Sequence, residues 1–235
     1  MENEKKFIIS INTHDINLLT DQLKNIKQFL KFKYIVILNC NVELYDIVKN
    51  KNFNNVHINP VHFDKSRFHG SLFKGIYENL KLALENYEFE YYLTLSARSI
   101  FNQALSKTNL DHFLHINKSY TVSKKIQRKN GGLVNLWGEF SKCKFYRFIL
   151  DNKLNIKHEM HEGFIFTSHQ AFEIQKFFNK NKDLLDSVYH TNTAMEELVI
   201  PTLLFNWFGY TQCLGLWPGC EKLPWAKNKI IHKKY

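Results

Sequence analysis

The 235-residue sequence has few of the residues that build disulfide frameworks, zinc sites or flexible linkers. Its four cysteines include no C-x-x-C pair, which excludes the common zinc-binding patterns. In a cytosol they are expected to be reduced thiols, and a bridge between Cys213 and Cys220 would require an oxidising compartment. No stretch rich in proline, glycine or serine divides the chain, and no internal repeat is present. A single domain over residues 1–235 is therefore predicted.

Long apolar runs are also absent. No run approaches the length of about eighteen residues that a membrane span requires, and the apolar segment within MENEKKFIISIN is too short for a secretory signal. We therefore expect a cytoplasmic protein. The apolar fraction of 44% and the aromatic fraction of 15% are sufficient for a sizeable globular core and are not typical of a disordered chain.

Acidic residues are outnumbered by basic ones, 22 to 32, so the formal net charge is +10. Most of the excess is lysine, and arginine occurs only at Arg67, Arg98, Arg128 and Arg147. The charge has two interpretations. It can reflect the lysine and asparagine bias of an AT-rich genome, or it can attract phosphates, either of a nucleotide ligand or of an anionic membrane surface. Because no zinc finger or RNP-type motif is present, no nucleic-acid partner is expected.

Apolar segments in the first hundred residues alternate between the periodicities of strands and helices. Strands are predicted at 7–12, 34–39, 55–61 and 91–95, and helices at 18–32, 42–50 and 70–86. This alternation predicts an α/β domain with a Rossmann-type, mainly parallel sheet flanked by helices. The sequences G-x-G-x-x-G and G-x-x-x-x-G-K-[ST] are absent, so the dinucleotide-binding and P-loop interpretations lose their main support.

The second half of the chain is less regular. Residues 102–162 form a basic, loop-rich region, and a strand at 163–168 and helices at 169–185 and 193–208 are predicted after it. Thr193 and Glu196 have the spacing of a capping box at the start of the last helix. Pro201 cannot donate a helical hydrogen bond, so this helix is expected to kink or loosen there.

The predicted fourth strand ends in polar residues. In YYLTLSARSIF (91–101), an apolar run leads directly into Ser96, Ala97, Arg98 and Ser99. Ligands of open α/β sheets bind outside the carboxyl ends of the strands. Ser96 and Arg98 are therefore candidates for contact with a ligand.

The order of the motifs resembles that of the core-2/I-branching glycosyltransferases, a family of β-1,6-N-acetylglucosaminyltransferases and peptide xylosyltransferases. The resemblance rests on the segments FIISINTHD, NVHINPV with RFHGSLFKGIYENLKLAL, YYLTLSARSIF, EGFIFTSHQAF and MEELVIPTLL. It covers most of the chain and is thinnest over 102–160. It implies a GT-A-like fold, with a nucleotide-binding half at 1–101 and an acceptor-binding and catalytic half at 102–235, and transfer with inversion at the anomeric carbon.

Most GT-A enzymes carry an Asp-x-Asp after the fourth strand, whose carboxylates hold a divalent metal against the donor diphosphate. Hard cations prefer oxygen ligands, especially carboxylates, and Ser96-Ala97-Arg98-Ser99 contains no acid. The family that the chain resembles also lacks the acidic pair, and its aspartate falls here at Ser99. The resemblance therefore implies no metal cofactor, with lysine or arginine neutralising the diphosphate.

The resemblance also implies that Glu197 is the general base that removes the proton of the acceptor hydroxyl. The family's glutamate falls on Glu197 when the following Thr202-Leu203 is matched, whereas the capping box would tie Glu196 to the helix start. The alternative for Glu197 is a solvated first-turn glutamate that the helix dipole favours.

The remaining candidate residues are grouped by role. Donor diphosphate binding is predicted for Lys229, Lys227, Arg98, Arg67 and Ser96, nucleoside binding for Asn12, Thr13, His14 and Asn39, and acceptor binding for Glu162, His161 and Trp137. The two C-terminal lysines could instead lie in a frayed tail, Arg67 in a solvated loop, and Trp137 in core or rim packing. Ser71 is expected to be the N-cap of the helix at 70–86. The family's second phosphate arginine would fall near Cys213, where this chain has none.

Two functions are expected from these observations. The first is a metal-independent inverting glycosyltransferase that moves a sugar, GlcNAc by resemblance, from a UDP-sugar to a glycan or glycolipid hydroxyl, in the cytoplasm or peripherally at an anionic membrane. The second is a GT-A-like domain that has lost catalysis and only binds a glycan or nucleotide, which the missing acids and the missing arginine favour. A nucleic-acid-handling protein has only the charge in its support.

Overall fold

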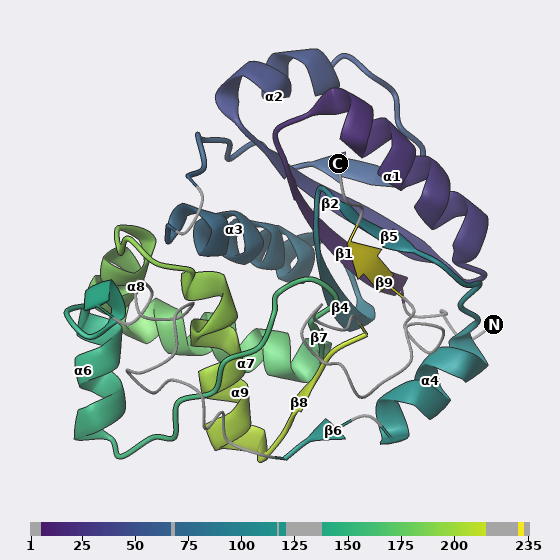
Figure 1. Ribbon diagram of the computed structural model, residues 1–235. Coiled ribbons are helices and arrows are strands. Elements are labelled where there is room, and N and C mark those ends of the chain that lie inside the picture. Colours follow the sequence, from purple (N-terminus) through teal and green to yellow (C-terminus); the bar gives the residue numbers. More distant parts are fainter. Residues whose placement is uncertain (1–5, 67–68, 117, 121–137, 215–229, 233–235) are drawn as a thin grey trace.

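The computed structural model describes residues 6–66, 69–116, 118–120, 138–214 and 230–232. Its central element is a five-stranded sheet with the order β3-β2-β1-β4-β7. The strands are β1 (Lys6–Thr13), β2 (Tyr34–Cys40), β3 (Val56–Ile58), β4 (Phe89–Ser96) and β7 (Ile165–Thr167). The first four run parallel, and β7 is antiparallel to β4. The predicted fold class, a mainly parallel α/β sheet flanked by helices in a single domain, is confirmed (Figure 1).

Helices connect and cover the strands. They are α1 (Ile16–Phe29), α2 (Val42–Val48), α3 (Ser71–Asn86), α4 (Lys107–Ile116), α6 (Lys144–Asp151), α7 (Ser168–Lys180), α8 (Lys182–Tyr189) and α9 (Val199–Phe208), with the 3₁₀ turn η1 (Met195–Glu197) before α9. Two short antiparallel pairs complete the described chain: β5 (Ser99–Phe101) with β9 (Ile230–His232), and β6 (Lys118–Ser119) with β8 (Thr211–Gln212). Within the described residues, no helix combines the length and the apolar character that a bilayer crossing would need.

The core lies on both faces of the sheet, because successive side chains of a strand point to opposite sides. In β1, Ile8 packs into the cluster beneath α3 and α7, whereas Phe7 and Ile9 pack into the cluster beneath α1. The face of α3 that carries Phe73 and Leu80 is fully buried. Sequence periodicity predicted these elements because each of them has one face packed into one of these cores.

Two predicted helices differ from those observed. The helix predicted at 169–185 is two helices separated at Asn181, whose backbone leaves helical geometry while its side-chain amide donates to the Phe177 carbonyl at 2.7 Å. Asparagine competes with the helix through such local bonds. The helix predicted at 193–208 begins only at Val199. Pro201 thus lies in the first turn, where its missing N–H costs no bond, and the expected kink is not required.

Both predicted helix caps are wrong. The residue that precedes η1 is Ala194, and no side-chain cap bond is made there, so Thr193 and Glu196 form no capping box. The N-cap of α3 is Gly70, and Ser71 is the first helical residue. The Ser71 hydroxyl instead accepts a hydrogen bond from the Ser66 backbone at 3.0 Å.

Candidate functional site

The carboxyl ends of β1, β2 and β4 meet at one edge of the sheet. Asn12 is in register with Asn39 of β2 on one side and with Ser96 of β4 on the other. The chain leaves β1 toward β2 and β3 and returns to β4 on the opposite side, so the strand order reverses at β1. Open α/β sheets bind ligands at such a switch point, outside the carboxyl ends of the strands.

The antiparallel direction of β7 adds residues from the second half of the chain to this edge. The start of β7 lies beside the end of β4, because the Gly163 amide donates to the Thr94 carbonyl at 2.8 Å and the Thr94 amide donates to Phe164 at 2.9 Å. The preceding residues, His161 and Glu162, are therefore held next to the end of β4. Their Nδ1 and Oε2 atoms are 3.4 Å apart.

The 3₁₀ turn η1 brings two glutamates to the same place. The Glu159 amide donates to the Glu197 carbonyl at 3.0 Å, which joins the segment before β7 to η1. The His158 Nε2 lies 2.8 Å from Oε2 of Glu197. We refer to His158, His161, Glu162, Glu196 and Glu197 as the glutamate–histidine cluster.

The two adjacent glutamates of this cluster have different environments. Glu196 is only 4% exposed, and its Oε2 has no hydrogen-bond partner among the described residues. Burial, followed by the neighbouring Glu197 and by Glu162, raises the pKa of the Glu196 carboxyl well above its ordinary value, so it tends to keep its proton. The Glu197 side chain is 12% exposed and pairs with His158. Glu197 is thus the member of the pair that combines solvent access with a hydrogen-bonded carboxylate.

Three residues of the cluster could hold a divalent cation. One ligand atom from each of His161, Glu196 and Glu197 lies within 4.8 Å of the others, and imidazole with carboxylate is a suitable ligand set. These acids come from parts of the sequence remote from the position where most GT-A enzymes carry their Asp-x-Asp. The expectation that no metal cofactor is needed stays a prediction.

The segment before β7 is anchored by a buried lysine. Lys157 is 3% exposed, and its Nζ lies 3.0 Å from Oε1 of Glu159 and 2.7 Å from the Ser119 hydroxyl. The Thr202 hydroxyl bonds to both the amide and the carbonyl of Lys157, each at 3.0 Å, and thereby ties the segment to α9. Pairing satisfies the buried charge. These contacts hold the backbone next to His158, whose ring bonds to Glu197.

The polar end of β4 forms a tight turn into β5. The hydroxyls of Ser96 and Ser99 are 3.1 Å apart, and the Ser96 carbonyl accepts from Gln22 Nε2 at 2.7 Å. The Arg98 side chain is exposed, and none of the described carboxylates pairs with it. As far as the described residues go, Arg98 is thus available at this edge. Diphosphate binding by Ser96 and Arg98 stays a prediction.

The predicted nucleoside-binding residues differ in accessibility. His14 is exposed and Asn12 is half-buried, whereas Thr13 and Asn39 are buried. Asn12 donates to the Leu72 carbonyl at 3.1 Å, and Asn39 is fully buried and donates to the Val61 carbonyl at 2.7 Å. These residues lie at one edge of the sheet, but the side-chain amides of the two asparagines donate to backbone carbonyls of the chain itself. Their nucleoside contacts stay predictions.

Other predicted site residues lie outside the described part of the chain. They are Arg67, Trp137, Lys227 and Lys229. Of the acceptor candidates, His161 and Glu162 are described, with side chains 14% and 13% exposed, respectively. They lie within the cluster that contains Glu197.

Two residues of this edge were not identified from the sequence. His158 lies in the stretch KHEMHEG (157–163), whose histidines and acids would have been the signal. Lys65 lies in the connection from β3 to α3, where only Arg67 had been singled out. A side chain at Gly75 would lie 2.9 Å from Cε of Lys65, so the lysine stem packs directly on α3. Burial lowers the pKa of Lys65 to about 8.

The free energy of unfolding is expected to rise, relative to that of a Lys65→Met variant, as the pH is raised from about 8 to about 10.5. The pKa of Lys65 is about 8 in the folded chain and 10.5 ordinarily. Between these values the unfolded chain binds more protons, so stability increases with pH. The effect is at most about 3 kcal/mol. Urea denaturation of both proteins near the two ends of this pH window measures it, and a pH-independent difference between them would contradict the prediction.

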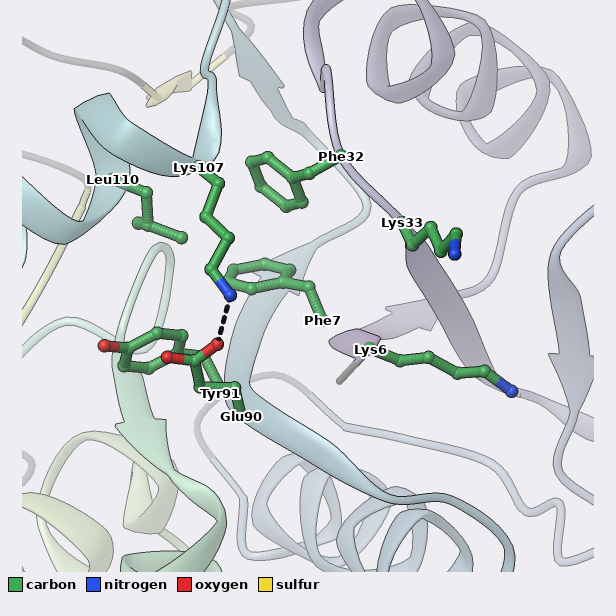
Figure 2. Close-up of a pocket in the computed structure, with 8 residues that line it drawn as sticks. All are labelled: Lys6, Phe7, Phe32, Lys33, Glu90, Tyr91, Lys107 and Leu110. Carbon is green, nitrogen blue, oxygen red and sulfur yellow. Dashed lines mark hydrogen bonds and ion pairs between the residues drawn. The ribbon is translucent and has the colours of Figure 1, made fainter. Parts of the chain in front are cut away.

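A small cavity at the opposite edge of the sheet is not a second candidate for the ligand-binding site. Figure 2 shows its lining residues, which include Lys6 and Phe7 at the start of β1 and Glu90 near the start of β4. Lys107 pairs with Glu90 at 2.7 Å across it. Its volume of about 10 Å³ has room for roughly one water molecule. A nucleotide sugar could not enter it.

Comparisons with known proteins add little to this geometry. No family model matches the chain, and no curated protein matches it. Among solved structures, the glycosyltransferase TarS of S. aureus matches at 14% identity, with a TM-score of 0.31. The match covers 47% of this chain and 19% of TarS. A similarity at this level carries no functional argument.

Proposed function

We propose that the chain is a glycosyltransferase that moves a sugar from a nucleotide-sugar donor to a hydroxyl of an acceptor, with Glu197 as the general base. The observation that carries the proposal is the position of Glu197. It lies in a cluster beside the carboxyl end of β4, next to the switch point of the sheet, and its Oε2 is 2.8 Å from His158.

The reaction requires a base for the acceptor proton and positive charge for the departing diphosphate. His158 engages Oε2 of Glu197, and no described side chain hydrogen-bonds its Oε1. Oε1 can therefore accept the proton of an acceptor hydroxyl, whose oxygen attacks the anomeric carbon as the diphosphate leaves. His161 and Glu162, in the same cluster, are proposed to contact the acceptor.

The finer features of the reaction are also proposals. The order of the sequence motifs supports a UDP-sugar donor, GlcNAc as the sugar, inversion of configuration and a glycan or glycolipid acceptor. The absence of an acid between Ser96 and Ser99 supports metal-independent transfer with lysine and arginine at the diphosphate. The formal charge of +10 supports peripheral contact with an anionic membrane surface, and a cytoplasmic location stays a prediction.

Transfer or donor hydrolysis is expected to persist in excess EDTA when the protein is incubated with a panel of nucleotide sugars. Product formation can be followed by chromatography of the released nucleotide. Loss of activity in EDTA and its recovery with Mn²⁺ would instead assign a metal to His161, Glu196 and Glu197, whose spacing permits one. Donor binding without turnover would favour the alternative of a non-catalytic domain, which the missing acids at 96–99 also favour. Oligonucleotide binding without nucleotide-sugar binding would overturn the proposal.

A further inference from the structure

Two lysines converge on one aromatic ring between β3 and α3. The ammonium of Lys65 lies 4.7 Å from the centre of the Phe63 ring, and that of Lys74 lies 4.5 Å from the same centre. Lys74 also lies 5.4 Å from the centre of the Tyr189 ring. Cation–π contacts offset part of the cost of desolvating an ammonium ion. Both ammonium groups therefore lie within 5 Å of the centre of the same ring.

Neither ammonium is neutralised by a carboxylate within the described residues. The ion pairs of this part of the chain include neither Lys65 nor Lys74. The hydrogen bond of Lys65 Nζ is a long one, 3.4 Å to the Phe63 carbonyl. The titratable groups facing Lys65 are the Cys40 thiol, whose pKa burial raises, and Asp64, which is exposed. Removing an ammonium group from water without a counterion is unfavourable.

The helix dipole increases this positive potential. Lys74 lies in the first turn of α3, and that turn contains no acidic residue. A helix N-terminus carries the positive end of the macrodipole and favours anions over cations. A lysine in this turn is therefore contrary to the preference of helix N-termini for negative charge. An anion bound beside Lys74 would explain its position.

The two lysines lie at the edge of the sheet that carries the candidate site. A side chain at Gly75 of α3 would meet both Cε of Lys65 and the side-chain oxygen of Asn12, the residue next to the end of β1. The Asn12 amide in turn donates to Leu72 in the first turn of α3. Lys65 thus lies near the ends of β1 and β2, while the glutamate–histidine cluster lies at the end of β4 and the start of β7. The two charge types lie on opposite sides of the switch point.

We infer that Lys65 and Lys74 bind the phosphates of a nucleoside diphosphate. The inference takes the identity of this anion from the proposed function. Charge-assisted N–H···O bonds from two ammonium groups suit the several oxygens of a diphosphate, and the bound anion supplies the missing counter-charge. Donor binding and proton removal thus involve different residues.

The test is isothermal titration of UDP, with uridine as the comparison ligand, into the full chain and three lysine variants. Lys65→Met and Lys74→Met remove the proposed contacts, and Lys176→Met removes an exposed lysine of α7 as the matched control. UDP affinity is expected to fall about 10-fold to 100-fold in each of the first two, since a hydrogen bond to a charged group contributes about 1.5–3 kcal/mol. The control and uridine binding are expected to change less than about twofold.

Thermal midpoints measured with and without UDP distinguish a phosphate-binding role of Lys65 from a structural one. Lys65→Met removes a half-buried cation without a carboxylate partner among the described residues, so its thermal midpoint without ligand is expected to equal or exceed that of the unaltered chain. Its UDP-induced increase in thermal midpoint is expected to be lost. A Lys65→Arg variant, which retains the charge, is expected to keep part of that increase.

Several outcomes would overturn the inference. Unchanged UDP affinity in Lys65→Met and Lys74→Met would do so, and if sugar transfer still depended on Glu197, the proposed function would survive. Equal weakening of UDP and uridine would assign Lys65 to the nucleoside and not to the phosphates. Conversely, loss of UDP binding in both variants, in a protein without transferase activity, would support this site and overturn the proposed function alone.

Discussion

Glu197→Gln is expected to reduce the rate of sugar transfer by about 10²-fold to 10⁴-fold, the range typical for loss of a general base. Glutamine has nearly the same shape and can keep a hydrogen bond to His158, which lies 2.8 Å from Oε2. It cannot accept a proton at neutral pH. The loss is therefore expected in kcat, with donor affinity changed little.

Two variants make this measurement specific. Glu196→Gln replaces a carboxyl whose raised pKa favours its protonated form, so the amide is a close mimic and a much smaller effect is expected. Glu173→Gln makes the same substitution on α7, at a residue paired with Lys176, and no effect is expected. Steady-state rates of nucleotide release provide the comparison. If Glu196→Gln abolished transfer and Glu197→Gln did not, the base would be Glu196.

Gly70→Ala is expected to lower the free energy of unfolding by about 2–4 kcal/mol. A Cβ at this position would overlap the Val188 carbonyl oxygen and lie 2.8 Å from that of Tyr189. Both obstacles are backbone atoms at the end of α8, so no side-chain rotation can relieve the clash. The Gly70 amide also donates to the Thr191 carbonyl at 2.8 Å, and this bond would be strained by any displacement.

Urea denaturation measures the change, with Gly138→Ala as its control. Apart from its chain neighbours and its own helix, no atom of the described residues lies within 4 Å of a Cβ built on Gly138, which is exposed and helical. The control is expected to leave stability unchanged or to raise it by up to about 1 kcal/mol. Equal stabilities of the Gly70 and Gly138 variants would show that α3 and α8 are not packed as closely as described.

Gly70 also links stability to the candidate site. It precedes α3, whose first turn carries Lys74, and α3 packs against η1, which carries Glu197. Displacement of the start of α3 would therefore alter both the lysine pair and the glutamate–histidine cluster. Weakened UDP binding is expected to accompany the loss of stability in Gly70→Ala.

Sequence periodicity predicted the four parallel strands because each is rich in apolar residues, most of which pack into the cores on the two faces of the sheet. The strand ends were less well predicted. The strand predicted at 55–61 is observed only over Val56–Ile58. The Asn59 amide still donates to the Leu38 carbonyl of β2 at 2.8 Å, and the Asn59 side chain bonds to Asn79 of α3 at 2.9 Å. A local window of residues contains no information about such a distant partner.

The candidate site was predicted only in part for the same reason. Glu197, His161 and Glu162 were identified as candidates, and the structure brings them together. His158 and Lys65 were missed. The cluster forms because β7 is antiparallel to β4. The sequence could not predict this, because an apolar strand of three residues has the same pattern in a parallel or an antiparallel arrangement. Only pairing with β4 shows that the residues before β7 lie at the carboxyl edge.

The sequence by itself determined the α/β alternation, the absence of acids after β4 and the presence of two adjacent glutamates. These are properties of local order and composition. Tertiary structure decided which glutamate is buried, which one pairs with His158, and where Lys65 lies without a carboxylate partner among the described residues. Burial and charge pairing arise from contacts between residues that are tens of positions apart. The chemistry of identical side chains therefore differs with their position in the fold.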